Sequence, residues 1–283
     1  MWKKQFALSL SRASGIPFVD QLQMVKDAGF DGFFVICYPD VDMEELAMKA
    51  KELKLRFQSV HAPWDMAAEL WHADAQTARK GVQKLCQCVD HCVNCDVPIL
   101  VVHPFVGFER HDVTEQGLEC YGQVVDYARE KGIKIAFENV EGIAFLDALM
   151  TRFEKDDTVG FCWDSGHEMC YNHSQDLLAR YGHRLLCTHL NDNLGIKDFE
   201  GNITFLDDLH LLPFDGVADW QDIAKRLHGC GFEDILTFEL NLTSKPGRHE
   251  NDCYRQMPFA QYLAEAYKRA CRVGRMLTKL EEN

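Results

Sequence analysis

The chain has 283 residues, of which 47% are hydrophobic and 26% charged, and its 44 Asp and Glu against 30 Lys and Arg give a formal net charge of −14. These values are typical of a globular protein and exclude a disordered or fibrous one. The acidic balance disfavours a dedicated nucleic-acid-binding protein, because neutralising phosphates requires a surplus of Lys and Arg. No apolar run approaches the roughly 18 residues of a membrane span, so no membrane partner is expected.

The 12 cysteines bear on the compartment in which the protein works. The first residues of the chain lack the long apolar core and the small-residue cleavage site of a secretory signal. We therefore expect free thiols in a reducing, cytoplasmic environment. The tightest group of cysteines lies in segment 73–95, where helical spacing puts Cys88, Cys92 and Cys95 on one face. We expect them to pack there as small hydrophobic side chains rather than to hold a metal.

Short apolar runs alternate along the chain with longer segments whose apolar residues have helical spacing. In chain order, the predicted strands are 6–10, 32–37, 56–61, 99–103, 135–139, 160–164, 185–190 and 235–240. The predicted helices are 18–28, 43–53, 73–95, 114–131, 143–153, 175–181, 220–230 and 257–280.

This strict alternation implies a parallel sheet with right-handed crossovers. Eight units fit a closed (β/α)8 barrel better than an open sheet, and no GxGxxG motif follows the first strand. We therefore predict an α/β protein with one TIM barrel domain over residues 1–283, in which the barrel covers about 6–256 and a C-terminal helix about 257–280. The active site of such a barrel lies at the C-terminal ends of its strands.

Acidic and histidine side chains end most of the predicted strands. Taken singly, each would be interpreted as a structural hydrogen-bonding group, but in a barrel all these ends meet at one mouth. Burying several carboxylates together is costly unless a cation neutralises them, and Glu, Asp and His are ligands for divalent Mn, Mg or Zn. The residues are His61, His103, Glu138, Asp164, His189 and Glu239, with His167 three residues after Asp164 and with Asp208 and His210 in the loop after the seventh strand.

In their order and their placement of one per strand, the motifs around these residues resemble the xylose isomerase-like barrels. This superfamily contains the sugar phosphate isomerases and epimerases and is related to the apurinic endonucleases of the endonuclease IV type. The resemblance runs from about residue 6 to residue 240. Its motifs are Ser59-Val60-His61-Ala62-Pro63, Val102-His103-Pro104, Glu138-Asn139 with Gly142, Asp164-Ser165-Gly166-His167, His189-Leu190-Asn191-Asp192, Asp208-Leu209-His210 and Phe238-Glu239.

The resemblance implies a metal-dependent isomerase or epimerase that acts on a sugar or sugar derivative through an enediolate. In such enzymes one divalent ion polarises a carbonyl, one glutamate removes the proton alpha to it, and a second glutamate returns a proton. By resemblance the metal ligands are Glu138, Asp164, His189 and Glu239, the two catalytic glutamates are Glu138 and Glu239, and the residues that contact substrate are His61, His103, His167 and Trp64.

The sequence departs from one subtype of this superfamily. Ketose 3-epimerases of the tagatose and psicose type typically carry a Glu and an Arg where this chain has Ala144 and Gly195. Glu141 lies near the first of these positions, but we expect it to be a solvated loop carboxylate. Phe214 and Asp215 replace the usual turn residues in the loop after the seventh strand. The Lys base of the large xylose isomerases has no evident counterpart.

Other functions remain open on the same scaffold. An inosose-type dehydratase would begin with the same proton abstraction alpha to a carbonyl. A metal-free sugar-binding protein is disfavoured because both Glu138 and Glu239 are present. No Gly-rich strand–helix turn suggests a phosphate site, so an unphosphorylated sugar is preferred. A homodimer is a mild expectation from the resemblance.

A trinuclear zinc phosphodiesterase acting on abasic DNA is the alternative from a different class. The net charge of −14 counts against it, because the field would repel a duplex. The loops at 11–17 and 38–42 contain only Arg12 as a basic residue, whereas loops that enter DNA would carry several. In that enzyme five residues would complete the three-zinc site as additional ligands: His61, His103, His167, Asp208 and His210.

Overall fold

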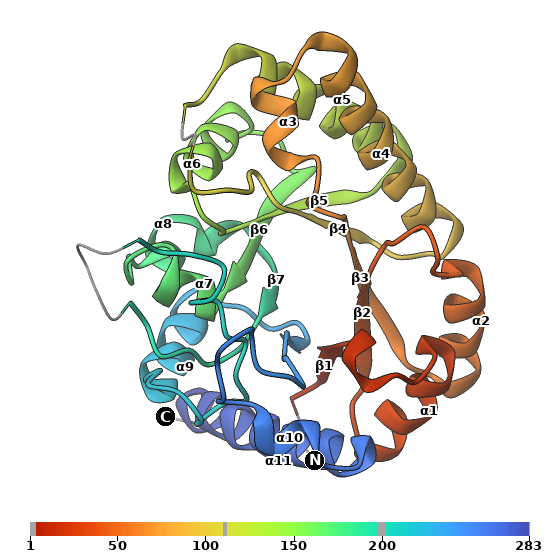
Figure 1. The fold of residues 1–283 in the computed structure, drawn as a ribbon, viewed down its shortest axis with the longest axis vertical. Helices are drawn as coiled ribbons and strands as arrows, with labels where there is room; N and C mark the ends of the chain where they lie inside the picture. The colour runs from red at the N-terminus through yellow and green to blue at the C-terminus, as the bar shows by residue number, and fades with distance from the viewer. Residues whose placement is uncertain (1–3, 110–111, 197–201, 283) are drawn as a thin grey trace.

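The computed structural model describes residues 4–109, 112–196 and 202–282. Eight parallel strands form a nearly closed barrel, with helices between them on the outside (Figure 1), which confirms the predicted fold class. The strands are β1 (Phe6–Ser9), β2 (Gly32–Ile36), β3 (Arg56–His61), β4 (Ile99–Val102), β5 (Lys134–Glu138), β6 (Val159–Asp164), β7 (Leu185–His189) and β8 (Leu236–Phe238).

The helices follow the predicted pattern, with additions in the loops. Two short 3₁₀ helices occur at Arg12–Ser14 and Gly182–Arg184. The α-helices are α1 (Phe18–Ala28), α2 (Met43–Leu53), α3 (Ala67–His72), α4 (Ala75–Asn94), α5 (Glu115–Lys131), α6 (Ile143–Arg152), α7 (Ser165–Cys170), α8 (Leu177–Tyr181), α9 (Trp220–Gly229), α10 (Asp252–Arg255) and α11 (Phe259–Glu281).

Three short helices, α3, α7 and α10, were not predicted, because none has two full turns of periodic apolar residues. Pro258 explains the start of the C-terminal helix at Phe259 rather than at 257, since proline is tolerated only where a helix begins. Asp74 caps α4 by accepting hydrogen bonds from the backbone N–H groups of Gln76 and Thr77. The predicted helix over 73–95 therefore begins two residues later than expected.

The ring of strands has one weak joint, which is the incomplete ladder of hydrogen bonds between β7 and β8. Every other neighbouring pair forms a parallel ladder, and β1 pairs with both β2 and β8. Between β7 and β8 the structure has an isolated bridge, in which Leu190 donates to the carbonyl of Thr237 and accepts from the N–H of Glu239. The hydroxyl of Thr188 accepts from the N–H of Thr237 at 3.1 Å, so a side chain replaces one backbone partner here.

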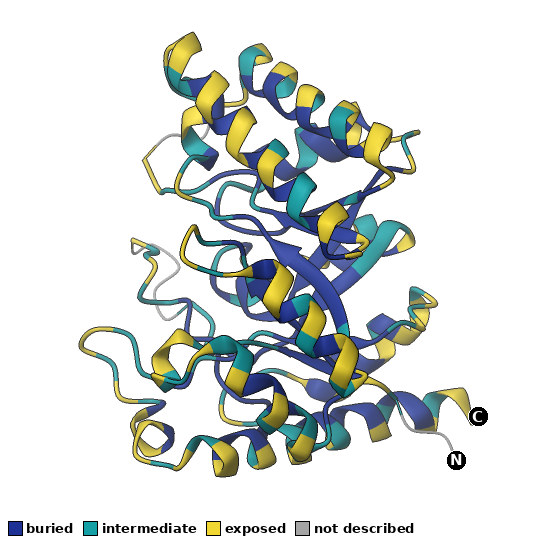
Figure 2. Ribbon diagram, turned by 90° about the vertical axis from the view of Figure 1, so that its right-hand side faces the viewer, coloured by how far each residue is buried: buried dark blue, intermediate teal, exposed yellow. Residues whose placement is uncertain are grey.

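The core has two parts. A small cluster fills the barrel interior, and a much larger one packs between the strands and the helices, whose buried faces turn toward the sheet in Figure 2. Cys88, Cys92 and Cys95 are buried in the larger cluster, as the helical spacing predicted. No helix among the described residues is long and apolar enough to cross a membrane.

Candidate metal centre

The predicted site residues lie together at the C-terminal ends of the strands. Glu138, Asp164 and His189 are the last residues of β5, β6 and β7, and Glu239 directly follows β8. These four side chains each offer a ligand atom, and all four atoms lie within 4.8 Å of one another. Glu138, Asp164 and His189 are fully buried.

Two glutamates converge on one histidine nitrogen at the middle of this group. Nδ1 of His189 lies 3.2 Å from Oε1 of Glu138 and 3.0 Å from Oε2 of Glu239. Its ring is held flat against the ring of Phe34, with centroids 4.4 Å apart and planes 10° apart. Two carboxylates therefore approach the same point from β5 and β8.

Several buried polar atoms of this group have no hydrogen-bond partner of good geometry among the described residues. They are Oε1 of Glu138 and both ring nitrogens of His189. Buried polar atoms are nearly always satisfied in folded proteins, so such a cluster needs another partner. A buried carboxylate oxygen and an imidazole without such partners, beside two further carboxylates, fit a divalent cation once the imidazole loses its proton.

The electrostatics of the group point in the same direction. Burial raises the pKa of Glu239, but His189 and His210 oppose it and lower that pKa to about 2. Burial raises the pKa of Asp164 to about 6, although His167 acts against it. Burial lowers the pKa of His189, but Glu138 and Glu239 raise it well above its usual value. Protonated histidines thus balance the carboxylates where a metal ion would otherwise do so.

Asparagine amides orient Asp164. Asn191 donates from Nδ2 to Oδ2 of Asp164 at 2.8 Å, and the backbone N–H of His167 donates to Oδ1 at 2.6 Å as Asp164 caps α7. Asn139 bonds both the N–H and the C=O of Asp164, each at 2.8 Å. Such outer contacts fix a ligand carboxylate before any ion binds.

His61 and His103 lie on the other side of Glu138. Nε2 of His61 is 3.1 Å and Nε2 of His103 is 3.4 Å from the same oxygen, Oε2 of Glu138. Trp64 stacks on the ring of His103, with centroids 5.3 Å apart, and meets the ring of His61 edge-on. Three of the four residues predicted to contact substrate, His61, His103 and Trp64, therefore lie together there.

The remaining predicted residues form a second group next to the first. Oδ1 of Asp208 lies 2.8 Å from Nε2 of His210 and 3.5 Å from Nε2 of His167. Lys245, in the loop after β8, places Nζ 3.3 Å from the other oxygen of Asp208. Lys245 was not predicted, because a lone lysine in a polar loop carries no periodicity or motif.

Asp192 holds the loop that carries Asp208 and His210. Its buried carboxylate accepts hydrogen bonds from the backbone N–H groups of Phe214 and Ala218 and from the indole N–H of Trp220. Trp220 begins α9, so the far end of the loop is bonded to a residue three positions after the end of β7.

The structure also places one cysteine beside this group. Glu138, Cys162 and His189 have potential ligand atoms within 4.8 Å of one another. Cys162 lies in β6 within the barrel interior, where burial raises the pKa of its thiol well above its usual value. A neutral thiol is a poor ligand, so we interpret Cys162 as a packing side chain.

Comparison with known proteins gives the family of the chain. A family model described as the xylose isomerase-like TIM barrel matches residues 22–257. The chain belongs to this family. An uncharacterized protein, y4fM, from Sinorhizobium fredii (strain NBRC 101917 / NGR234) is 29% identical over an alignment of 256 residues. The match covers 77% of this chain and 79% of that protein.

Solved structures share the fold of this xylose isomerase-like barrel at low identity. An L-ribulose 3-epimerase superposes with a TM-score of 0.72 and 16% identity, over 99% of this chain and 96% of that one. The IolI protein with a bound zinc atom gives 0.71 and 19%, over 98% and 99%. A fusion of such a barrel with 4-hydroxyphenylpyruvate dioxygenase gives 0.76 and 14% over 99% of this chain, which spans only 44% of that longer chain.

The departures from the ketose 3-epimerase subtype have structural outcomes. The prediction that Glu141 is a solvated loop carboxylate was wrong. Its residue is only 8% exposed, and its carboxylate accepts a hydrogen bond from the N–H of Gly107 at 2.7 Å. Phe214 adopts a positive φ of 75°, where glycine is usual, and the guanidinium of Arg272 lies 3.7 Å over its ring. This family member thus fastens its altered turn to α11.

Proposed function

We propose that the protein is a divalent-metal-dependent isomerase or epimerase of a sugar or sugar derivative. The observation that carries the proposal is the convergence of Glu138 and Glu239 on Nδ1 of His189, at 3.2 and 3.0 Å. Two carboxylates held about one point provide a base and an acid for moving a proton between neighbouring carbon or oxygen atoms.

Glu138, Asp164, His189 and Glu239 would hold the ion, and the IolI neighbour was solved with zinc, which makes Zn a candidate beside Mn and Mg. When bound, a divalent ion supplies the polarisation of a substrate carbonyl that makes the adjacent C–H bond acidic.

The exposure of the two glutamates assigns their roles in proton transfer. The side chain of Glu239 is 18% exposed and that of Glu138 is fully buried, so Glu239 is the carboxylate that a substrate can reach more easily. As an ionised carboxylate, Glu239 can take the proton alpha to the carbonyl. For an isomerisation, Glu138 would take the proton of the neighbouring substrate hydroxyl and pass it to carbon, while Glu239 gives its own proton to the former carbonyl oxygen. His167, His61 and His103 would hydrogen-bond the substrate oxygens around them.

Two features disfavour the abasic-DNA phosphodiesterase. The Arg12 guanidinium, the one basic group in loops 11–17 and 38–42, pairs with Asp40 through two hydrogen bonds and lies over the ring of Tyr38. Lys245 already supplies a positive charge to Asp208, where a further zinc would bind. Arg12 is therefore not free to neutralise a DNA phosphate. The negative charge of Asp208 is already partly neutralised before any further zinc binds.

Solvent exchange tests the proposal. The metal-loaded protein is incubated in D₂O with a panel of ketoses and inososes, and products are examined by NMR and mass spectrometry. We expect deuterium at the carbon alpha to the carbonyl and an isomer or epimer as product. Loss of water from an inosose would reassign the protein as a dehydratase, and three tightly bound zinc ions with cleavage of abasic DNA would contradict the proposal.

A further inference from the structure

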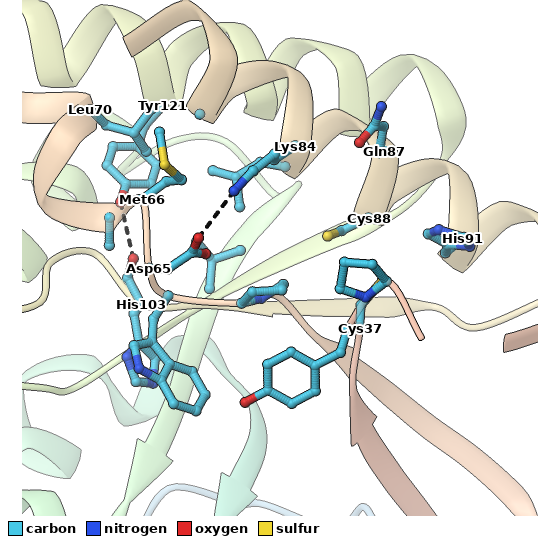
Figure 3. A pocket seen from close by; sticks show the side chains of 18 of the residues that line it. Cys37, Asp65, Met66, Leu70, Lys84, Gln87, Cys88, His91, His103 and Tyr121 are labelled. Atoms are coloured by element: carbon cyan, nitrogen blue, oxygen red, sulfur yellow. Dashed lines mark hydrogen bonds and ion pairs between the residues drawn. The ribbon is translucent and has the colours of Figure 1, made fainter. Parts of the chain in front are cut away.

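A cavity of about 630 Å³ lies beside the candidate metal centre, between the loop after β2, the loop after β3 and helices α3 and α4. Figure 3 shows Lys84, Gln87, Cys88 and His91 along α4 on one side, with His103 on the opposite side. The volume is within the range of roughly 300–1,000 Å³ that small-molecule sites occupy.

The cavity is separate from the carboxylates but shares a wall with them. None of Glu138, Asp164, His189 and Glu239 lines it, whereas His103 and Trp64 do. His103 lies 3.4 Å from Glu138 on its other side, and Trp64 stacks on His103. A sugar ring over the carboxylates would leave this cavity vacant, so the space suits an additional part of a larger substrate.

Apolar and aromatic side chains form most of the lining. Tyr38 and Val41 come from the loop after β2, Met66 and Leu70 from the α3 region, and Leu85 from α4. Such walls bind through buried apolar area and ring contacts, and they give a sugar hydroxyl few hydrogen-bond partners. The lining therefore favours an aromatic or other apolar ring over a second sugar.

Charge at the edge of the cavity favours an uncharged occupant. Among the described residues that line it, Lys84 is the single Lys or Arg, and its Nζ bonds Oδ2 of Asp65 at 3.0 Å. Both side chains of this pair are more than half exposed, so the pair lies at the solvent edge of the cavity, and its two charges cancel. A phosphate or carboxylate would find no unpaired cation there.

We propose that this cavity binds the apolar, ring-containing substituent of a sugar conjugate whose sugar ring lies over Glu138 and Glu239. The inference rests on the proposed function and deepens it, because it makes a glycoside or related conjugate that bears a ketone a better substrate than a free ketose. Trp64 and His103 lie at the junction, where the sugar ends and the substituent begins.

The test compares two probes that differ only in the substituent, the methyl and phenyl glycosides of a 3-keto-hexose. Their Kd values for the metal-loaded protein are measured by titration calorimetry, and deuterium exchange from D₂O is followed in parallel. We expect the phenyl glycoside to bind at least tenfold more tightly, because its ring leaves water for an apolar wall.

Variants that fill the cavity assign the effect. Val41→Trp and, from the exposed side of α4, Gln87→Trp should reduce the phenyl preference to less than twofold and leave methyl glycoside binding unchanged. Val217→Trp is the matched control, since Val217 is 65% exposed and does not line the cavity. Two fillers are used because either one alone could fail to fold, which melting curves would reveal.

Each outcome decides one claim. Equal Kd values, absence of phenyl glycoside binding, or a preference that survives both fillers would overturn the cavity proposal even if exchange occurs. A phenyl preference without exchange would instead uphold the cavity and contradict the proposed isomerase or epimerase. A wild-type dimer that Gln87→Trp dissociates in sedimentation would show that a second copy covers the cavity, and that too would overturn the proposal.

Discussion

Gly166 lies against the side chain of Asn191 so closely that a Cβ at position 166 would be 1.9 Å from Oδ1 of Asn191. The same side chain donates from Nδ2 to Oδ2 of Asp164 at 2.8 Å. The absence of a side chain at 166 therefore sets the position of the asparagine, which in turn sets the position of a candidate metal ligand.

Gly166→Ala should weaken metal binding without unfolding the protein. The new methyl group displaces Asn191, and loss of an outer contact to a ligand costs about 10- to 100-fold in metal affinity. Titration calorimetry with Mn²⁺ or Zn²⁺ measures the change. Gly122→Ala in α5 is the control, because a Cβ there meets nothing within 4 Å. Equal affinities for the two variants would remove the role assigned to Asn191.

Glu239→Gln should leave the fold intact and reduce turnover by about 100-fold or more, since general base catalysis contributes on the order of 10²–10⁴. The amide has the size of the carboxylate but does not accept the proton. Deuterium exchange and product formation are measured at saturating metal, with the metal content determined for each preparation. A fully metal-loaded variant with near-normal turnover would rule out proton transfer by Glu239.

Metal affinity should rise with pH. Although burial lowers it, the pKa of His189 is raised well above its usual value by Glu138 and Glu239, so the histidine is protonated before the ion binds. A ligand nitrogen must lose that proton, and release of one proton makes the Kd fall about tenfold for each pH unit. Burial raises the pKa of Asp164 to about 6, which adds a second proton at lower pH.

Calorimetry in two buffers with different ionisation enthalpies counts the protons released on metal binding. One proton near neutral pH, and more than one below pH 6, is the expected result. A Kd that stays constant between pH 6 and pH 8 would show that the ion does not displace the proton on His189.

Lys245→Ala should increase the amount of metal that the protein binds. Nζ of Lys245 neutralises Asp208, which faces His167 and His210 as well. Without the ammonium group, a second divalent ion becomes the nearest available cation, so the content should rise from one ion per chain toward two. Elemental analysis after dialysis against dilute Zn²⁺ checks this. Lys84→Ala, which unpairs the distant Asp65, should not change the content.

The alternation of apolar runs was sufficient to predict the barrel, because parallel strands buried on both faces have few polar residues and the helices between them have a clear period. The predicted strands end within two residues of the observed ones, and the last is the least accurate, since 235–240 was predicted and β8 is Leu236–Phe238. Only an isolated bridge joins β8 to β7, and apolar sequence alone does not reveal missing ladder hydrogen bonds.

The candidate site residues at the ends of strands could be predicted from the sequence, whereas those in the loops could be predicted less well. Glu138 and Asp164 were found because an acid at the end of a buried strand is unusual. The burial of Glu141, three residues after the end of β5, was not predicted. Its carboxylate is satisfied by the N–H of Gly107, and sequence spacing does not reveal such a tertiary contact. Lys245 meets Asp208 across 37 positions of sequence, so no local pattern could pair them.

The weak joint between β7 and β8 has a mechanical consequence. His189 ends β7 and Glu239 directly follows β8. An ion bound by both side chains would therefore link these two strands, which form the only incomplete ladder among the described strands. Hydrogen–deuterium exchange at the amides of Leu190 and Glu239 should slow when the ion is added, more than at β3 or β5. A bound ion would thus join β7 to β8 and stabilise the closed barrel. Loss of the ion would favour local unfolding first between these two strands, beside the candidate metal centre.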